Sequence, residues 1–209
     1  RAGPYPARRA GEGAVRDHVA AWTRRRAQPL VVSALVVVGC FLQAPGRLVR
    51  DTKLDLVVDP GGFLSRTLHL WDPSASFGQL QNQAVGYLFP IGPYFAIGHA
   101  LGVPGWILQR AWFAALLLAG LWGALRVFEA LDIGRPGSRV LGAAASGLSP
   151  SILTLVGFQS GAELPPALLP WALLPLILGA RRGSTRRAAG LSGLAIVAMG
   201  GVNAAATAA

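Results

Sequence analysis

Long apolar runs separated by short polar segments dominate the chain from residue 30 onward. The runs occupy residues 30–42, 111–125, 140–158, 164–180 and 188–209. Each approaches the roughly 17 to 25 residues that an α-helix needs to cross about 30 Å of hydrocarbon. The first run is the shortest, but its flanking residues, with the long side chain of Arg47 reaching the surface, extend it to a full span. The pattern predicts a helical protein that crosses a membrane several times.

These runs also predict how the chain is organised. The predicted spans are about 29–48, 106–128, 139–158, 163–180 and 188–209. Residues 1–28 are expected to form a basic cytoplasmic tail, and residues 49–105 one long outer loop. The last run reaches Ala209 without a polar stop, so we expect residues 29–209 to be the amino-terminal part of a larger transmembrane domain.

The composition favours the same class of protein. Hydrophobic residues make up 53% of the chain and charged residues only 13%, against roughly 25% charged residues in soluble domains. The net charge of +10 could suggest nucleic-acid binding, but arginines gather at the ends of predicted helices, at residues 24–26 and 181–187. Cytoplasmic loops of membrane proteins have this basic character. We therefore expect anionic headgroups of the lipid bilayer as the partner, and no nucleic acid.

The two basic segments also constrain the topology. If the amino end and residues 181–187 both face the cytoplasm, an even number of crossings must lie between them. Four predicted spans already satisfy this condition, so residues 87–103 should not be a complete crossing. This aromatic segment contains Pro90, Pro93 and His99, a composition typical of an interfacial or re-entrant helix. We expect it to lie along the outer surface of the membrane.

Acidic residues fall mainly on the predicted outer side of the membrane. These outer acids are Asp51, Asp55, Asp59, Asp72 and Glu163. Asp59 and Asp72 each precede a proline, and an Asp-Pro step is typical of a turn. They are therefore interpreted as turn residues, which leaves Asp51, Asp55 and Glu163 as candidates for chemistry.

Asp51 and Asp55 follow the first predicted span directly. If residues 50–58 continue as a helix, the two carboxylates share one face, and this like-charge pair costs about 0.2–0.5 kcal/mol in an isolated helix. A nearby cation such as Lys53, a divalent metal ion or a bound substrate would offset the repulsion.

A carboxylate at this position is well placed to deprotonate a sugar hydroxyl as a general base, with Asp51 in that role and Lys53 and Asp55 as electrostatic support. The departing phosphate of a lipid-linked donor would need a cation. Arg110, near the outer end of its span, could hold that phosphate through its guanidinium fork. It could equally be an interfacial arginine whose head reaches water beside neighbouring tryptophans.

Several sequence stretches carry a resemblance to a known family. They are DTKLDLVVDPGGFL at 51–64, LHLWDPS at 68–74, QLQNQAVGYLFPIGP at 79–93, GFQSGAELP at 157–165 and GGVN at 200–203. Together they resemble the amino-terminal part of the AftD-type actinobacterial arabinofuranosyltransferases. The resemblance covers most of the chain from about residue 30 onward and is absent from the first 28 residues.

This resemblance implies an all-α, polytopic glycosyltransferase of the GT-C superfamily, whose first outer loop contains surface-lying helices. It implies transfer of arabinofuranose from decaprenyl-phosphoryl-arabinose to cell-wall arabinan of arabinogalactan or lipoarabinomannan through an α-(1→3) bond. The site would face outward from the plasma membrane. Because the family carries its catalytic Asp just after the first span, the resemblance assigns that role to Asp51.

The resemblance also bears on metal binding. Related oligosaccharyltransferases place acidic metal ligands in the outer loop between the third and fourth spans, where this chain has Glu163. Only one acid is present there. A divalent cation is therefore a candidate cofactor without an assigned site, and Asp51 and Glu163 are its candidate ligands.

Other residues leave alternatives open. His69 could bond an arabinose hydroxyl, but a lone His beside Trp71 is more often a structural hydrogen-bonding residue. A lipid-linked-sugar transporter or a non-catalytic assembly subunit is the competing class of function. An ion-coupled carrier would usually have acidic residues near the middle of the bilayer, whereas the acids here lie at its edge or in loops. The sequence therefore favours the transferase.

Overall fold

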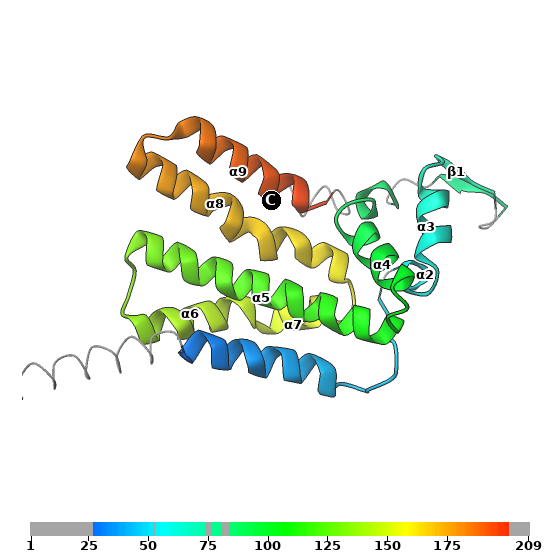
Figure 1. Cartoon of the computed structure of the whole chain (residues 1–209), viewed down its shortest axis with the longest axis horizontal. Coiled ribbons are helices and arrows are strands. Elements are labelled where there is room, and N and C mark those ends of the chain that lie inside the picture. Colours follow the sequence, from blue (N-terminus) through cyan, green and yellow to red (C-terminus); the bar gives the residue numbers. More distant parts are fainter. Residues whose placement is uncertain (1–26, 52, 74–76, 81–83, 201–209) are drawn as a thin grey trace, which may run out of the picture.

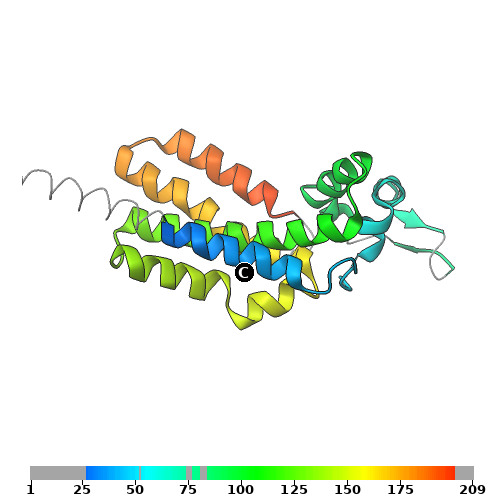
Figure 2. The same ribbon diagram turned by 60° about the horizontal axis from the view of Figure 1, so that its bottom comes forward.

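The computed structural model describes residues 27–51, 53–73, 77–80 and 84–200. Nearly all of the predicted tail, 1–28, and the end of the last predicted span, 201–209, lie outside the described residues. The helices that correspond to the predicted spans run lengthwise in one bundle, as Figures 1 and 2 both show. Its members are Ala27–Leu42, α5 (Gly105–Leu131), α6 (Pro136–Gly147), α7 (Pro150–Val156), α8 (Leu164–Arg182) and α9 (Thr185–Ala198).

Shorter elements gather at one end of this bundle (Figure 1). They are α2 (Leu54–Val58), α3 (Pro60–Thr67), β1 (Trp71–Asp72), β2 (Gln79–Leu80), the 3₁₀ turn η1 (Ala84–Tyr87) and α4 (Ile91–Ala100). The strands form a two-stranded antiparallel hairpin in which Trp71 pairs with Leu80. The sequence did not predict this hairpin, but the expectation of a helical GT-C-like fold agrees with the many helices of the chain.

The central element of the bundle is α5. It packs against α6 on one side and α8 on the other, and its buried residues, Leu116 and Leu121 among them, are spread around the helix. A helix that is apolar all round either lies in a protein core or spans a membrane. α5 therefore serves as the frame against which the other helices and the loops at the bundle end are positioned.

The predicted spans correspond to helices of different lengths. Within the described residues, α5 and the continuous stretch Ser160–Arg182 are long and apolar enough to cross a membrane. α6 and α7 pass the same test only as a pair, bent by 48°, and the apolar helix Ala27–Leu42 is shorter. The bend follows from Pro150 at the start of α7, which holds Ser149 in an extended conformation.

The first helix ends earlier than the predicted span of 29–48. It stops at Leu42, and the chain then turns through Gly46, which has a positive φ of 77°. The last carbonyls of a helix need partners from outside it, and here the guanidinium of Arg110 supplies hydrogen bonds to the turn that follows. The first helix therefore ends where Arg110 of α5 donates a hydrogen bond to the turn that follows Leu42.

The predicted interfacial segment 87–103 contains α4. Its 10 residues span about 15 Å, which is half of a hydrocarbon layer. The hydroxyl of Tyr94 donates to the carbonyl of Leu108 on α5 at 2.9 Å. Burial raises the pKa of this phenol above its ordinary value, so it stays protonated as a donor. α4 is thus a short helix fastened to the start of α5, and its place along the outer surface of the membrane stays a prediction.

Candidate functional site

The two ends of the bundle differ in charge. Within the described residues, the end that holds α2, α3 and the start of α8, called the acidic end, carries the outer acids Asp51, Asp55, Asp59, Asp72 and Glu163. Arg47, Arg50, Lys53 and Arg66 also lie there and roughly balance these acids. The opposite end, at the α5–α6 and α8–α9 turns (Figure 1), carries Arg126, Arg135, Arg139, Arg181, Arg182, Arg186 and Arg187. Only Glu129 and Asp132 are acidic there among the described residues. The acidic end is the candidate site.

Asp51 joins two loops that are far apart in the sequence. Its carboxylate accepts a hydrogen bond from the backbone N–H of Ser160, at 3.0 Å, and another from the hydroxyl of the same residue. Ser160 begins the 3₁₀ turn η2 (Ser160–Glu163), which leads directly into α8. The predicted catalytic carboxylate is therefore held on the turn that also carries Glu163.

The backbone leading to Asp51 is fastened to α5 by two fully buried polar residues. The side-chain amide of Gln109 accepts from the N–H of Val49 at 2.7 Å and donates to the carbonyl of Val49 at 2.8 Å. Arg110 donates to the carbonyls of Gln43 and Arg47 at 3.0 and 3.4 Å. Because both residues lie on the central helix, the path from the first helix to Asp51 has a rigid support.

Arg110 is not the interfacial arginine that was one of the two sequence interpretations. It is 0% exposed, so its head does not reach water along the surface of α5 as an interfacial arginine would. One guanidinium nitrogen, Nη2, bonds backbone carbonyls, while Nε and Nη1 have no hydrogen-bond partner among the described residues. In this structure Arg110 therefore organises the turn after the first helix, and its contact with a phosphate stays a prediction.

Glu163 is buried at the start of α8. Only 1% of it is exposed, and its Oε2 has no hydrogen-bond partner among the described residues. Buried polar groups are nearly always paired, since leaving one unpaired is costly. The helix dipole at the start of α8 favours a negative charge at this position. A carboxylate with one oxygen unsatisfied is a feature more typical of a binding site than of packing.

The other predicted residues take different positions. The predicted i,i+4 pair of Asp51 and Asp55 is wrong, because α2 begins only at Leu54 and Asp51 lies outside the helix. Asp55 instead pairs with Arg66 of α3, at 3.2 Å, on the surface. Lys53 is the residue that precedes α2, and His69 is exposed just after α3. Their predicted contacts with substrate stay predictions.

Asp59 is a turn residue, as the sequence predicted. Its carboxylate accepts from the N–H of Gly62 at 2.9 Å, and Pro60 occupies the first position of α3. This is the usual arrangement of a side-chain cap followed by proline at a helix start. Asp59 therefore caps α3, whereas Asp51 is the candidate for catalysis.

Two residues of the site were not predicted, Ser160 and Gln109. Ser160 lies within the segment GFQSGAELP, but nothing in the sequence pairs it with a carboxylate 109 residues away. Gln109 offered a signal, because a polar residue inside an apolar span is usually there for a partner. The sequence does not indicate which group the side chain bonds, and in the structure it is the backbone of Val49.

The donor set for a metal ion is limited. Among the described residues, no group of three or more His, Cys, Asp and Glu side chains comes together. Calcium and magnesium usually take six or more oxygen ligands. Asp51 and Glu163 could contribute, but these two carboxylates alone do not make a protein-held metal site.

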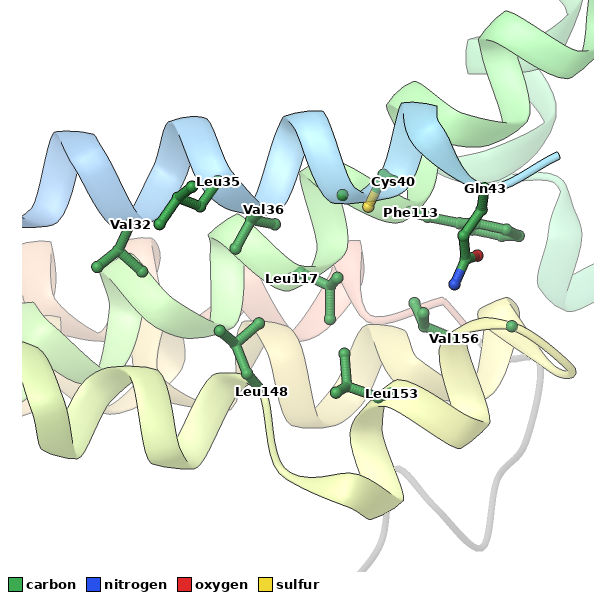
Figure 3. Close-up of a pocket in the computed structure, with 12 residues that line it drawn as sticks. Val32, Leu35, Val36, Cys40, Gln43, Phe113, Leu117, Leu148, Leu153 and Val156 are labelled. Atoms are coloured by element: carbon green, nitrogen blue, oxygen red, sulfur yellow. The ribbon is translucent and has the colours of Figure 1, made fainter. Parts of the chain in front are cut away.

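An apolar cavity of about 470 Å³ opens beside this region (Figure 3). Side chains of the first helix, including Val36 and Cys40, face Phe113 and Leu117 of α5, and Val156 of α7 lies across from them. Gln43 lies at the end of the cavity where the first helix stops (Figure 3). Its lining is suited to hydrocarbon rather than to a sugar.

Long apolar helices, with carboxylates distributed over the loops and helix starts at one end, define a helical membrane protein whose candidate site lies where the bundle ends. The chain belongs to a known family of such proteins, because residues 35–209 match the family model "Alpha-(1->3)-arabinofuranosyltransferase, N-terminal GT-C domain". The predicted AftD-type family and GT-C-like helical fold are therefore confirmed.

Curated relatives and solved structures agree with this assignment. The alpha-(1->3)-arabinofuranosyltransferase of Mycobacterium tuberculosis (strain ATCC 25618 / H37Rv) is 53% identical over 180 residues, which cover 85% of this chain and 13% of the relative. The enzyme of the same name from Mycolicibacterium smegmatis (strain ATCC 700084 / mc(2)155) is 52% identical over 178 residues, with the same coverage. The chain thus spans only about an eighth of these relatives.

The fold is similar to that of cryo-EM structures of arabinofuranosyltransferase AftD from Mycobacteria. One of them superposes with a TM-score of 0.81 and 50% identity, covering 88% of this chain and 14% of that one. A structure of a mutant form, class 2, gives a TM-score of 0.83 and 52% identity, again over 88% of this chain and 15% of the other.

Proposed function

We propose that the protein containing this chain transfers arabinofuranose from decaprenyl-phosphoryl-arabinose to cell-wall arabinan, forming an α-(1→3) bond. Family membership supports a glycosyltransferase, and the names of the relatives support arabinofuranosyl transfer. The apolar cavity beside the first helix supports a donor with a hydrocarbon chain. The activity is proposed for the whole protein, since this chain spans 13% of its relatives.

The observation that carries this proposal is the contact of Asp51 with Ser160. Two donors from one turn, the backbone N–H and the hydroxyl of Ser160, orient the carboxylate. Asp51 is half-buried, so an acceptor hydroxyl can approach it. We assign Asp51 as the general base that takes the hydroxyl proton as the sugar is transferred.

Glu163 is the second proposed participant. Its unpaired Oε2 is three residues from Ser160 along the same turn, and could accept from a sugar hydroxyl or bind a cation that accompanies the donor phosphate. The substrate-binding roles of Lys53, Asp55, His69 and Arg110 belong to this proposal as well, with Arg110 the least accessible of them.

The proposed topology puts the acidic end outside the plasma membrane and the arginine-rich end in the cytoplasm. The excess of arginine at the α5–α6 and α8–α9 turns supports this orientation, since cytoplasmic loops are enriched in basic residues. The proposed map keeps a cytoplasmic tail at 1–28, an outer loop at 49–105, and spans at the five apolar blocks.

The orientation can be tested with single cysteines in a Cys40→Ser background. Pro73→Cys marks the acidic end and Ser184→Cys the opposite end, and both positions are exposed. A membrane-impermeant maleimide applied to intact cells should label Pro73→Cys alone. Labelling of Ser184→Cys alone would reverse the topology.

The activity can be tested with purified full-length protein, labelled decaprenyl-phosphoryl-arabinose and an arabinan acceptor. Because a general base contributes about 10²–10⁴-fold, Asp51→Asn should lower the rate by that factor. Glu163→Gln keeps the buried shape and should lower the rate about 10–100-fold through loss of a charged hydrogen bond. Asp59→Asn, which keeps an acceptor at the α3 cap, is the matched control and should remain active.

The outcomes separate the alternatives. A wild-type rate in Asp51→Asn would remove Asp51 as the base. Absence of transfer by the wild-type protein, with normal folding and donor binding, would favour a lipid-linked-sugar transporter or an assembly subunit instead.

A further inference from the structure

The turn between α8 and α9 lies far from the acidic end of the bundle (Figure 1). A small pocket of about 220 Å³ lies at this turn. Its lining is amphiphilic. The side chains of Arg182 and Arg187 meet the apolar side chains of Leu178 and Leu191 around it. A cavity with two guanidinium groups beside an apolar wall matches a ligand that has an anionic head and a hydrocarbon tail.

The pocket is rigidly built. α8 and α9 touch at Gly179, where an added Cβ would lie only 2.4 Å from the Cβ of Ala188. The chain reverses through Gly183, which has a positive φ of 68° and ends α8. The hydroxyl of Ser192 donates to the carbonyl of Ala172 at 2.5 Å and fastens the two helices together. The two arginines therefore project from a fixed hairpin rather than from a loose loop.

The charge at this turn lacks compensation within the protein. Residues 181–187 are all exposed, and none of the ion pairs between described residues involves the four arginines among them. Arg181 and Arg182 suit the end of α8, because the helix dipole is negative there. Arg186 and Arg187 lie in the first turn of α9, where the dipole is positive and no acidic residue is present. An anion bound at this turn would offset the unfavourable placement of Arg186 and Arg187 at the start of α9.

The location determines which anion can reach the pocket. Arg182 is the last residue of Ser160–Arg182, one of the helices able to cross a membrane, so the pocket lies at a membrane interface. Exposed apolar residues continue away from it along both helices, Leu176 on α8 and Leu194 on α9. Anionic lipids are abundant at such an interface and attract basic residues.

We propose that this pocket binds an anionic phospholipid, with its phosphate between Arg182 and Arg187 and its acyl chains along Leu178 and Leu191. Guanidinium groups suit this role because their planar forks donate two parallel hydrogen bonds to phosphate oxygens. The bound lipid neutralises the start of α9 and anchors the hairpin at the membrane surface. The site is independent of the proposed transfer reaction.

The test compares two double variants of the full-length protein that remove the same charge. Arg182→Gln with Arg187→Gln alters the pocket, whereas Arg181→Gln with Arg186→Gln alters only the residues beside it. Each protein is reconstituted in nanodiscs of phosphatidylglycerol and phosphatidylcholine, and the lipid retained after detergent extraction is measured by native mass spectrometry. The pocket variant should retain phosphatidylglycerol about tenfold less than wild type, and the control less than about twofold less.

A third variant separates lipid from free anion. Leu191→Asn removes part of the apolar wall at an exposed position and should also reduce phosphatidylglycerol retention. Equal losses in the two arginine pairs would show diffuse surface charge and overturn the proposal. Displacement of the lipid by millimolar inorganic phosphate, or full retention in Leu191→Asn, would show that the pocket recognises a free anion and would also overturn it.

Discussion

Replacing Gln109 by Leu should loosen the backbone that carries Asp51. The substitution keeps a side chain of similar size on α5 but removes both hydrogen bonds to Val49, at 2.7 and 2.8 Å. Each such bond contributes about 0.5–1.5 kcal/mol net, so the free energy of unfolding should fall by about 1–3 kcal/mol. Values near the lower limit are expected if the site is surrounded by lipid, where side-chain hydrogen bonds average about 0.6 kcal/mol.

The effect on turnover should exceed the effect on stability. Asp51 lies two residues beyond Val49, and a displacement of about 1 Å at a catalytic group can lower the rate about 10²-fold. We therefore expect kcat to fall while KM changes little, because the proton acceptor moves but the residues that bind substrate do not.

The assay measures thermal unfolding in detergent together with kcat and KM for arabinose transfer. Ser33→Ala is the matched control, because it removes the hydrogen bond from Trp122 of α5 to the first helix, 3.0 Å long, at the opposite end of the same helix pair. It should lower stability but not kcat. Equal losses of kcat in Gln109→Leu and Ser33→Ala, or a wild-type kcat in Gln109→Leu, would refute the reasoning.

Two further predictions concern stability. Gly147→Ala should lower the free energy of unfolding by about 1–3 kcal/mol, because its Cβ would lie 2.9 Å from the backbone nitrogen of Leu121. Gly190→Ala, in α9 with nothing within 4 Å, should instead stabilise by about 0.5–1 kcal/mol, and thermal unfolding of both variants checks the pair. Asp59→Ala should cost about 0.5–2 kcal/mol and speed hydrogen exchange in α3, whereas Asp59→Asn should do neither, since it keeps an acceptor for the N–H of Gly62. Unchanged exchange in Asp59→Ala would remove Asp59 as the cap.

Apolar length was a sufficient guide to where the helices lie, because backbone groups in an apolar environment must be paired within a helix. It was a poor guide to where they stop. The first helix ends at Leu42 rather than near residue 48, in a turn to which Arg110 of α5 donates. The predicted span 139–158 is broken, although Pro150 signalled the position of the break.

Some features of the site could likewise be predicted from the sequence, whereas others could not. Asp59 could be interpreted from its neighbour Pro60 alone, since a helix cap is a local structure. The predicted pairing of Asp51 with Asp55 failed, because α2 begins only at Leu54. Before it, Val49 is bonded to Gln109, and Asp51 to Ser160. Those partners lie 60 and 109 residues away, and helical periodicity carries no information about them.

By itself, the sequence determined a helical membrane protein of the AftD type with acids at one end of its helices and arginines at the other. Hydropathy and charge act residue by residue, so their distribution can be followed along the chain. Only the tertiary structure decided that Asp51 lies on the turn of Glu163, that Arg110 is buried, and that Arg182 and Arg187 share a pocket. Such contacts depend on how the helices pack around α5, which brings residues together regardless of their separation in the chain.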